Sequence, residues 1–109
     1  REVKKLTDTE MAEVNRNKAV RGYIIRCLVK GFNNAALTRQ VSNSLMASGL
    51  IISPDISKYL DYLNGAGYTE FTQDKVTAYT AYSKDAVVKL TKKGIDLVEG
   101  TIEDPGVDV

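Results

Sequence analysis

The spacing of apolar residues changes at Gly67, and this change constrains the fold more than any other feature of the sequence. Before Gly67, apolar residues recur three and four positions apart, which is typical of amphipathic helices. After it, Ala86, Val88 and Leu90 occupy every second position, which is typical of a strand with one buried face. The pattern predicts a mainly α chain with a small antiparallel strand pair, an α+β fold.

The first predicted helix covers residues 8–30. Thr7 and Glu10 have the spacing of a capping box, in which each side chain satisfies a backbone amide of the first turn. The segment is one long helix or a short helix joined to a second at residues 15–17. Gly31 is expected to end it in a left-handed turn.

The second predicted helix covers residues 35–48. Residues 33–34 are both asparagine, which favours an N-cap, and Gly49 is a typical C-terminal stop. The row expected to be buried is Leu37, Val41 and Leu45.

The third predicted helix starts at Ser53 and Pro54 and ends near residue 64. Ser53 can cap it, and Pro54 can occupy the first helical position, where a missing amide does no harm. Its expected core face is Ile56, Tyr59, Leu60 and Leu63.

Two strands are predicted beyond Gly67, at residues 68–72 and 86–90, because aromatic and β-branched residues gather there. The intervening residues 73–85 are either a long flexible loop or an extended hairpin arm.

A last helix is expected to begin after Thr91, to turn Ile95 and Val98 inward and to end at Gly100. Residues 101–109 are acidic and are predicted to form a mobile tail.

Length and composition indicate one domain, residues 1–100, followed by that tail. The chain has no histidine, which removes the commonest general base near neutral pH and His-based zinc sites. Cys27 is the only cysteine and is expected in the core, in keeping with a reducing cytoplasm. No apolar stretch is long enough for a membrane span, and no leader is recognised. No catalytic residue, metal site or cofactor site is predicted, so an enzyme is not expected.

The stretch from Ala36 to Gly100 resembles winged helix-turn-helix domains. The resemblance lies in the segments SLMASGLIISPDISKYLDYLNGAGY and VVKLTKKGIDLVEG. A narrower likeness, in LTKKGIDLVEGTIEDPGV, is to small winged-helix proteins of Mu-like prophages. The resemblance implies that the strand pair is the β-wing of a winged helix-turn-helix. It also implies a prophage-related transcriptional regulator that binds double-stranded DNA in the cytoplasm.

In this fold the third helix usually enters the major groove with the side opposite its core face, while the wing contacts groove or backbone. The candidate DNA-binding residues on these elements and on the second helix are Arg39, Ser57, Lys58, Tyr62, Lys75, Tyr79 and Lys84. Tyr79 and Tyr82 have a structural alternative, because tyrosines also pack along the face of a hairpin.

The net charge of +1 is too small to indicate nucleic acid by itself. Residues 1–31 carry eight Lys/Arg against four Asp/Glu, and residues 95–109 carry five acids and no base. The third helix sets Lys58 against Asp55 and Asp61, which is unusual for a surface that meets phosphates. The alternative is therefore a winged helix used for protein–protein interaction or phage assembly, without direct DNA contact.

The first helix has a basic outer side, formed by Arg16, Lys18, Arg21, Arg26 and Lys30. Met11 and Val14 lie out of phase with its apolar stripe. These two residues are expected to form the seam of a homodimer.

Overall fold

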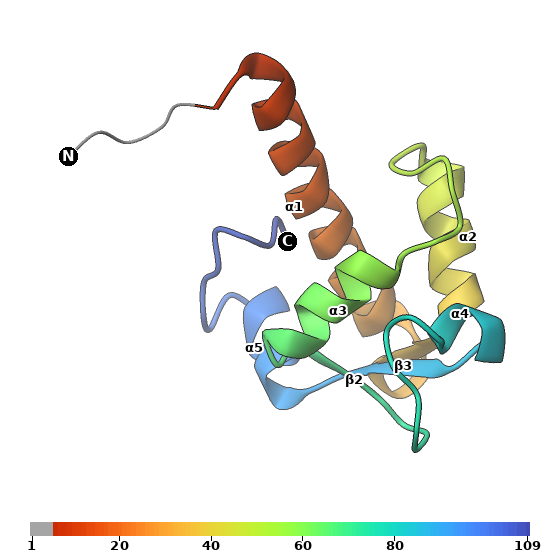
Figure 1. Ribbon diagram of the computed structural model, residues 1–109. Helices are drawn as coiled ribbons and strands as arrows, with labels where there is room; N and C mark the ends of the chain where they lie inside the picture. Colours follow the sequence, from red (N-terminus) through yellow and green to blue (C-terminus); the bar gives the residue numbers. More distant parts are fainter. Residues whose placement is uncertain (1–5) are drawn as a thin grey trace.

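The computed structural model describes residues 6–109 and shows a mainly helical chain with one small antiparallel sheet (Figure 1). The predicted α+β class is confirmed. The elements in chain order are α1 (Asp8–Lys30), a 3-10 turn (Phe32–Asn34), β1 (Ala35–Leu37), α2 (Thr38–Ser48), α3 (Ser57–Gly65), β2 (Thr69–Phe71), α4 (Ala81–Lys84), β3 (Val87–Leu90) and α5 (Lys92–Val98).

The first predicted segment is one continuous helix, α1. Its capping box is confirmed, because the Glu10 amide donates to Thr7 Oγ1 at 3.1 Å and the Thr7 amide donates to Glu10 Oε1 at 2.9 Å. The predicted left-handed turn at Gly31 is wrong: its φ is −77°, and glycine suits the position because a Cβ would lie 2.1 Å from the Ala35 carbonyl oxygen. Cys27 is half-buried rather than in the core. The predicted apolar stripe of this helix is Val20, Tyr23, Ile24, Cys27 and Leu28; of these, Val20, Ile24 and Leu28 are fully buried. Ile25 is fully buried as well.

The second helix begins later than predicted. Asn33 and Asn34 have φ values of 56° and 57° and form a turn instead of an N-cap. The residues after them form strand β1, which pairs with β3. Leu37 is therefore at the end of a strand and 44% exposed, so its predicted place in the buried row is wrong.

The N-terminus of α2 is held by the residues that precede β3. Thr38 Oγ1 donates to the Ala86 carbonyl oxygen at 2.6 Å, and the Arg39 amide donates to Asp85 Oδ1 at 3.0 Å. A remote aspartate thus satisfies an amide that a local N-cap would otherwise take. The rest of the prediction is confirmed by the buried Val41 and Leu45 and by the left-handed Gly49.

Helix α3 starts at Ser57, so the predicted start at Ser53 and Pro54 is wrong. These two residues lie in the loop that links α2 to α3, where Ser42 Oγ donates to the Pro54 carbonyl oxygen at 2.7 Å. The predicted core face is confirmed, since Ile56, Tyr59, Leu60 and Leu63 are all buried.

The sheet has the order β1-β3-β2, and both pairings are antiparallel. Thr69 lies opposite Leu90, and Phe71 lies opposite Val88. The predicted pair is confirmed: β2 is shorter than expected at both ends, and β3 starts later than expected but ends at Leu90 as predicted. Strand β1 was not predicted, because a short Ala-Ala-Leu segment carries little strand preference of its own.

Residues 73–85 are neither a flexible loop nor a hairpin arm. They form a turn that leads into the short helix α4, which lies below the N-terminal end of α2 in Figure 1. Ala78 and Ala81 are buried, so the segment is folded onto the body of the molecule.

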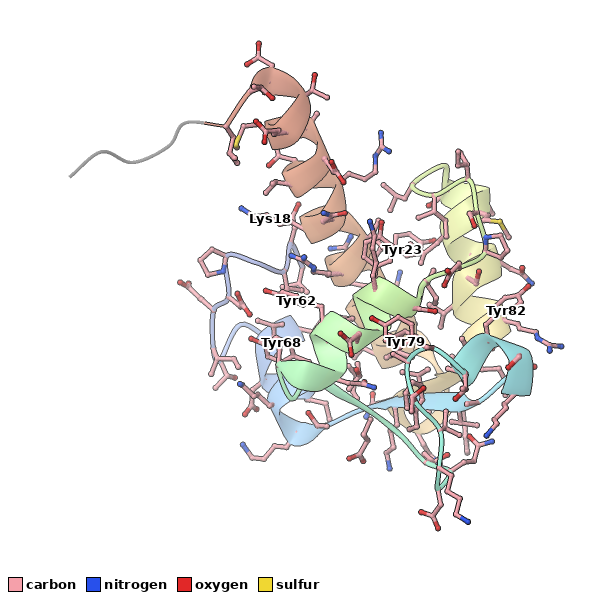
Figure 2. All side chains as sticks on the ribbon, in the orientation of Figure 1. Lys18, Tyr23, Tyr62, Tyr68, Tyr79 and Tyr82 are labelled. Atoms are coloured by element: carbon pink, nitrogen blue, oxygen red, sulfur yellow. The ribbon has the colours of Figure 1, made fainter. Side chains whose placement is uncertain are left out.

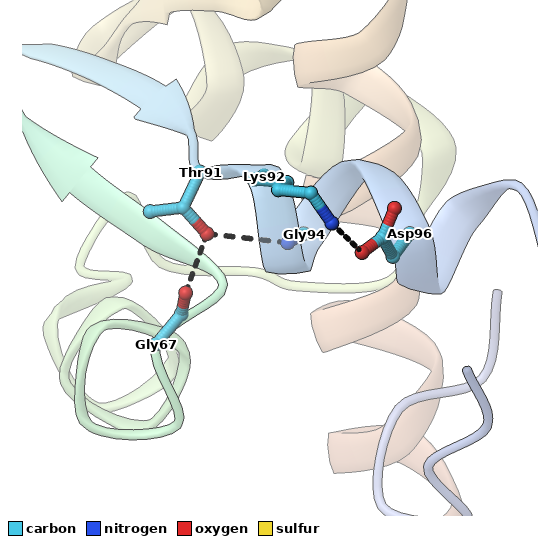
Figure 3. A network of polar contacts seen from close by, with 5 residues as sticks. All are labelled: Gly67, Thr91, Lys92, Gly94 and Asp96. Atoms are coloured by element: carbon cyan, nitrogen blue, oxygen red, sulfur yellow. Dashed lines mark hydrogen bonds and ion pairs between the residues drawn. The ribbon is translucent and has the colours of Figure 1, made fainter. Parts of the chain in front are cut away.

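Helix α5 begins as predicted. Thr91 Oγ1 accepts a hydrogen bond from the Gly94 amide at 3.2 Å and donates one to the Gly67 carbonyl oxygen (Figure 3). Ile95 and Val98 are partly buried against the core, and Leu97 between them is fully buried.

The C-terminal segment, residues 101–109, lies beside α1 (Figure 1). Val107 is 4% exposed, and the Asp108 amide donates to the Lys18 carbonyl oxygen at 3.1 Å. The approach is possible because residue 22 is glycine: a Cβ there would lie 1.7 Å from the Asp108 carbonyl oxygen. The segment predicted as a mobile tail is packed on the same body as the helices.

Candidate nucleic-acid interface

Arg39 lies in the first turn of α2 and ties this helix to α4. Its Nε donates to the Tyr82 carbonyl oxygen and its Nη2 to the Ser83 carbonyl oxygen, both at 3.0 Å. Its guanidinium also lies 5.4 Å from the centre of the Tyr82 ring, within the range of a cation–π contact. Arg39 is therefore a structural clamp that keeps its charge at an exposed position.

Lys84 and Lys75 lie next to that clamp. Lys84 is in α4, and its Nζ donates to the Lys75 carbonyl oxygen at 3.4 Å. Lys75 has a φ of 61° in the turn that precedes α4, and both side chains are exposed. The fold thus joins Arg39 to the backbone of α4 and Lys84 to the backbone of Lys75, so three predicted phosphate-contacting cations lie on adjoining segments: α2, the turn and α4. We call Arg39, Lys75 and Lys84 the cation cluster.

Two acids accompany the cation cluster. Asp85 uses its Oδ1 to cap the Arg39 amide, and Asp74 is exposed beside Lys75. The neighbourhood therefore has a small positive excess, far from the strong field of a highly basic protein.

Tyr79 and Tyr82 do not pack along a hairpin. Tyr79 is 68% exposed, and Tyr82 is 36% exposed beneath the Arg39 guanidinium. Figure 2 shows both rings on the side of the molecule that carries α4. Tyr79 is thus an exposed aromatic residue on the segment that leads into α4.

Ser57 and Lys58 lie at the start of α3. Ser57 Oγ donates to Asp55 Oδ1 at 2.6 Å, and the Ser57 amide donates to the same oxygen, so these hydrogen bonds lower the pKa of Asp55. The hydroxyl proton of Ser57 is therefore committed to a local contact. Lys58 is exposed, with its Nζ 4.9 Å from the centre of the Tyr59 ring.

Tyr62, the third predicted residue of α3, is partly covered. The Arg21 guanidinium carbon lies 3.6 Å from the centre of its ring, and a Cβ on Gly106 would lie 2.4 Å from its hydroxyl oxygen. Tyr62 remains only 37% exposed. It therefore serves mainly to join α3, α1 and the C-terminal segment.

The seven predicted residues thus form two groups. Figure 2 shows Tyr62 near the C-terminal segment and Tyr82 near α4, on opposite sides of the view. The α4 group contains the cation cluster and Tyr79. The α3 group contains Ser57, Lys58 and Tyr62, and Lys58 is its only cation.

Sequence reasoning missed the residues that hold the C-terminal segment. Arg21 Nη1 donates to the Gly106 carbonyl oxygen at 3.0 Å, and Arg26 Nη1 donates to the Asp108 carbonyl oxygen at 3.1 Å. Both had been predicted only as part of a basic outer side. The available signal was Gly22 between them, since a glycine inside a helix often marks a close backbone approach.

A second missed contact joins Tyr68 to Asp104. The Tyr68 hydroxyl donates to Asp104 Oδ2 at 2.6 Å. Burial and the adjacent carboxylate raise the pKa of Tyr68 to about 12, and the same hydrogen bond lowers the pKa of Asp104.

A shallow groove runs between the N-terminal half of α1 and α3. Its lining mixes both charges and one aromatic ring, from Thr9, Ala12, Glu13, Arg16, Asn17, Lys58 and Tyr59. Such mixed lining is typical of protein contacts rather than of phosphate contacts.

Comparisons of the chain with protein-family models, curated proteins and solved structures found no match. Within residues 6–109, no helix is long and apolar enough to cross a membrane. The same residues contain no group of three Cys, Asp or Glu side chains placed to hold a metal ion.

Proposed function

We propose that the chain is a winged helix-turn-helix protein that binds double-stranded DNA in the cytoplasm, as a prophage-related transcriptional regulator. The proposal assigns DNA contact to the α2–α4 end of the molecule. It makes binding, and no catalysed reaction, the activity of the chain.

The order of the elements supports the winged-helix part of this proposal. Helices α2 and α3 follow one another and are succeeded by the antiparallel pair β2 and β3, the arrangement of a helix-turn-helix with a wing behind it. The link between the helices, residues 49–56, is longer than the turn of about three or four residues in the simplest members.

The cation cluster is the observation that carries the DNA part. Arg39 comes from a part of the sequence far from Lys75 and Lys84, and the Asp85 side chain is committed to the Arg39 amide. Cations set close together neutralise neighbouring phosphates and release counterions, which is the main source of affinity for duplex DNA. The exposed ring of Tyr79, on the segment between Lys75 and α4, adds a planar group for backbone or groove contact.

Helix α3 has a smaller part in this proposal than its position in the fold suggests. Ser57 is bound to Asp55, and Tyr62 is covered by Arg21. Asp61 lies on the exposed side of the helix beside Lys58. We therefore expect phosphate contacts to dominate, with weak discrimination between DNA sequences.

The test is binding of a labelled random-sequence duplex followed by fluorescence anisotropy across a salt titration. We expect binding at low salt that weakens steeply as salt rises. Lys75→Gln and Lys84→Gln should each reduce the slope of log K against log[salt] by about one, because each removes one phosphate contact.

Lys92→Gln is the matched control. It removes one exposed cation from α5, where Lys92 pairs with Asp96 away from the cation cluster, and should leave the slope unchanged. Equal effects of all three substitutions would show that only the net charge matters. Absence of binding at about 50 mM salt would rule out the DNA proposal.

The groove between α1 and α3 favours a second candidate function, a protein-interaction or phage assembly module. The groove joins Tyr59 to mixed charges, and Met11 on α1 is 41% exposed while Val14 is half-buried. At about 100° per residue, Met11 and Val14 lie on the side of α1 opposite the groove lining, so a homodimer through them would leave the groove open to another protein. Analytical ultracentrifugation of the wild type and of Met11→Asp tests it: a dimer that dissociates in the variant supports this function, and a monomer in both excludes the homodimer.

A further inference from the structure

A pocket of about 330 Å³ lies between the C-terminal half of α1 and the N-terminal part of α2. This volume is at the lower end of the range for small-molecule sites. Its lining consists of Tyr23, Arg26, Cys27, Lys30, Gly31, Ala36, Gln40, Val41 and Ser44. The lining residues come from three different elements, so only the folded chain contains the pocket.

The charge of this lining has one sign. Arg26 and Lys30 line the pocket, and no acid does. Within residues 6–109, neither cation has a carboxylate oxygen within 4.0 Å. Arg26 uses one nitrogen, Nη1, for the Asp108 carbonyl oxygen, which leaves further guanidinium donors for another acceptor.

The remaining lining is suited to a small apolar body. Val41 is 1% exposed and belongs to the core, and Ala36 is half-buried on β1. The Tyr23 hydroxyl donates to the Ser44 carbonyl oxygen at 3.3 Å, which fixes the ring beside the pocket. Gln40 adds an amide that can donate or accept.

From this arrangement we infer that the pocket binds a small organic carboxylate. The carboxylate would lie between Arg26 and Lys30, and an aromatic or short aliphatic body would contact Val41, Ala36 and the Tyr23 ring. Charge-assisted hydrogen bonds to the two cations would provide most of the affinity and the preference for an acid, and burial of the apolar body would add to the affinity. The inference is independent of the DNA proposal, because none of these residues belongs to the cation cluster.

Cys27 provides a direct readout of occupancy. It lines the pocket and is the only cysteine of the chain, so its alkylation reports on this site alone. Burial raises the pKa of its thiol, so the reaction with iodoacetamide, an uncharged reagent, should be followed at mildly alkaline pH. A ligand in the pocket should cover the sulfur and slow the alkylation.

The experiment measures this rate with benzoate or hexanoate at concentrations up to about 10 mM, which covers the millimolar Kd of fragment-sized ligands. Benzamide, which has the same ring without the charge, is the matched control ligand. We expect saturable protection by at least one acid and little by benzamide. Lys30→Gln should weaken the binding of the protecting acid about three- to tenfold, whereas Lys92→Gln should leave that affinity unchanged.

Three results would overturn the inference. One is the absence of protection by both acids, and another is equal protection by benzamide and benzoate. The third is protection by an acid that Lys30→Gln leaves unchanged. Amide shifts in NMR spectra add a check on location, because a ligand in this pocket should perturb Gln40 and Ser44 and leave Lys75 and Lys84 unaffected.

Discussion

Gly22 lies in the middle of α1, at the point where the C-terminal segment crosses the helix. From the sequence, a glycine at this position is a defect that costs about 1 kcal/mol of helix propensity relative to alanine. In the folded chain it provides the room in which the Asp108 carbonyl oxygen approaches α1. The local cost is offset by burial of Val107, about 1.5 kcal/mol or more for a fully buried valine.

Gly22→Ala should therefore destabilise the protein, although alanine is the better helix former. We expect a loss of about 0.5–2 kcal/mol, because the new Cβ displaces the C-terminal segment and exposes Val107. Urea unfolding gives this value, and limited proteolysis should show earlier cleavage within residues 101–109. Gly65→Ala is the control: a Cβ there meets nothing within 4 Å, so it should be neutral or stabilising. Stabilisation by both substitutions would contradict the argument.

At the scale of elements, the decisive contact is the one between α4 and the start of α2. Helix α2 lacks a side-chain cap of its own, since the residue before it is Leu37. The acceptor is Asp85, which follows α4 and has a left-handed φ of 47°. Arg39 completes the joint by binding two carbonyl oxygens at the end of α4. The capping of α2 and the folding of residues 73–85 therefore depend on each other.

Asp85→Ala should weaken the contact between α4 and the start of α2. It removes the acceptor for the Arg39 amide, which costs about 0.5–2 kcal/mol, and it places alanine in a left-handed conformation at about 1 kcal/mol more. The free energy of unfolding in urea should fall by the sum of these effects. Asp85→Asn keeps an acceptor and tolerates the conformation, so it should retain most of the stability. Equal losses in the two variants would contradict the capping role.

At the scale of the whole molecule, the C-terminal segment links elements that are remote in the chain. It is bonded to α1 through Arg21 and Arg26 and to the residue before β2 through the Tyr68–Asp104 hydrogen bond. The folded pKa of Asp104 is lowered from its usual 3.8, so its contribution to stability is present above that pH and is lost as pH falls through the lowered value. The folded pKa of Tyr68 is raised from 10.0 to about 12, so its contribution is present below pH 10 and is lost as pH rises toward 12.

The melting temperature should accordingly be nearly flat between about pH 5 and pH 9 and should fall outside this window. Glu10 and Asp55 also have lowered pKa values, so part of the acid loss belongs to them. Asp104→Asn isolates the contribution of Asp104 to the acid loss. The variant should have a lower melting temperature than the wild type at pH 7, and its melting temperature should fall less steeply below pH 4. If the melting temperatures of the two proteins fell in the same way at acid pH, Asp104 would not contribute to the pH dependence of stability.

Much of the fold could be predicted because it depends on short-range interactions. The capping box at Thr7 and Glu10, the stop at Gly49 and the start of α5 at Thr91 each involve residues within a few positions of one another. The core face of α3 follows from helical spacing alone. In the same way, the alternation of buried apolar residues at Ala86, Val88 and Leu90 predicted strand β3.

The tertiary structure decided the features that depend on distant partners. Residues 35–37 form a strand only because β3 offers them hydrogen-bonding groups, and Leu37 is exposed for that reason. The candidate site is divided for the same reason. Arg39, predicted as a DNA contact, is hydrogen-bonded to the Tyr82 carbonyl oxygen. Tyr62, also predicted as a DNA contact, packs against Arg21. By itself the sequence determined which segments form helices and where those helices end, since these preferences are local. Which side chains meet depended on how the segments pack, because close contact between remote residues exists only in the folded chain.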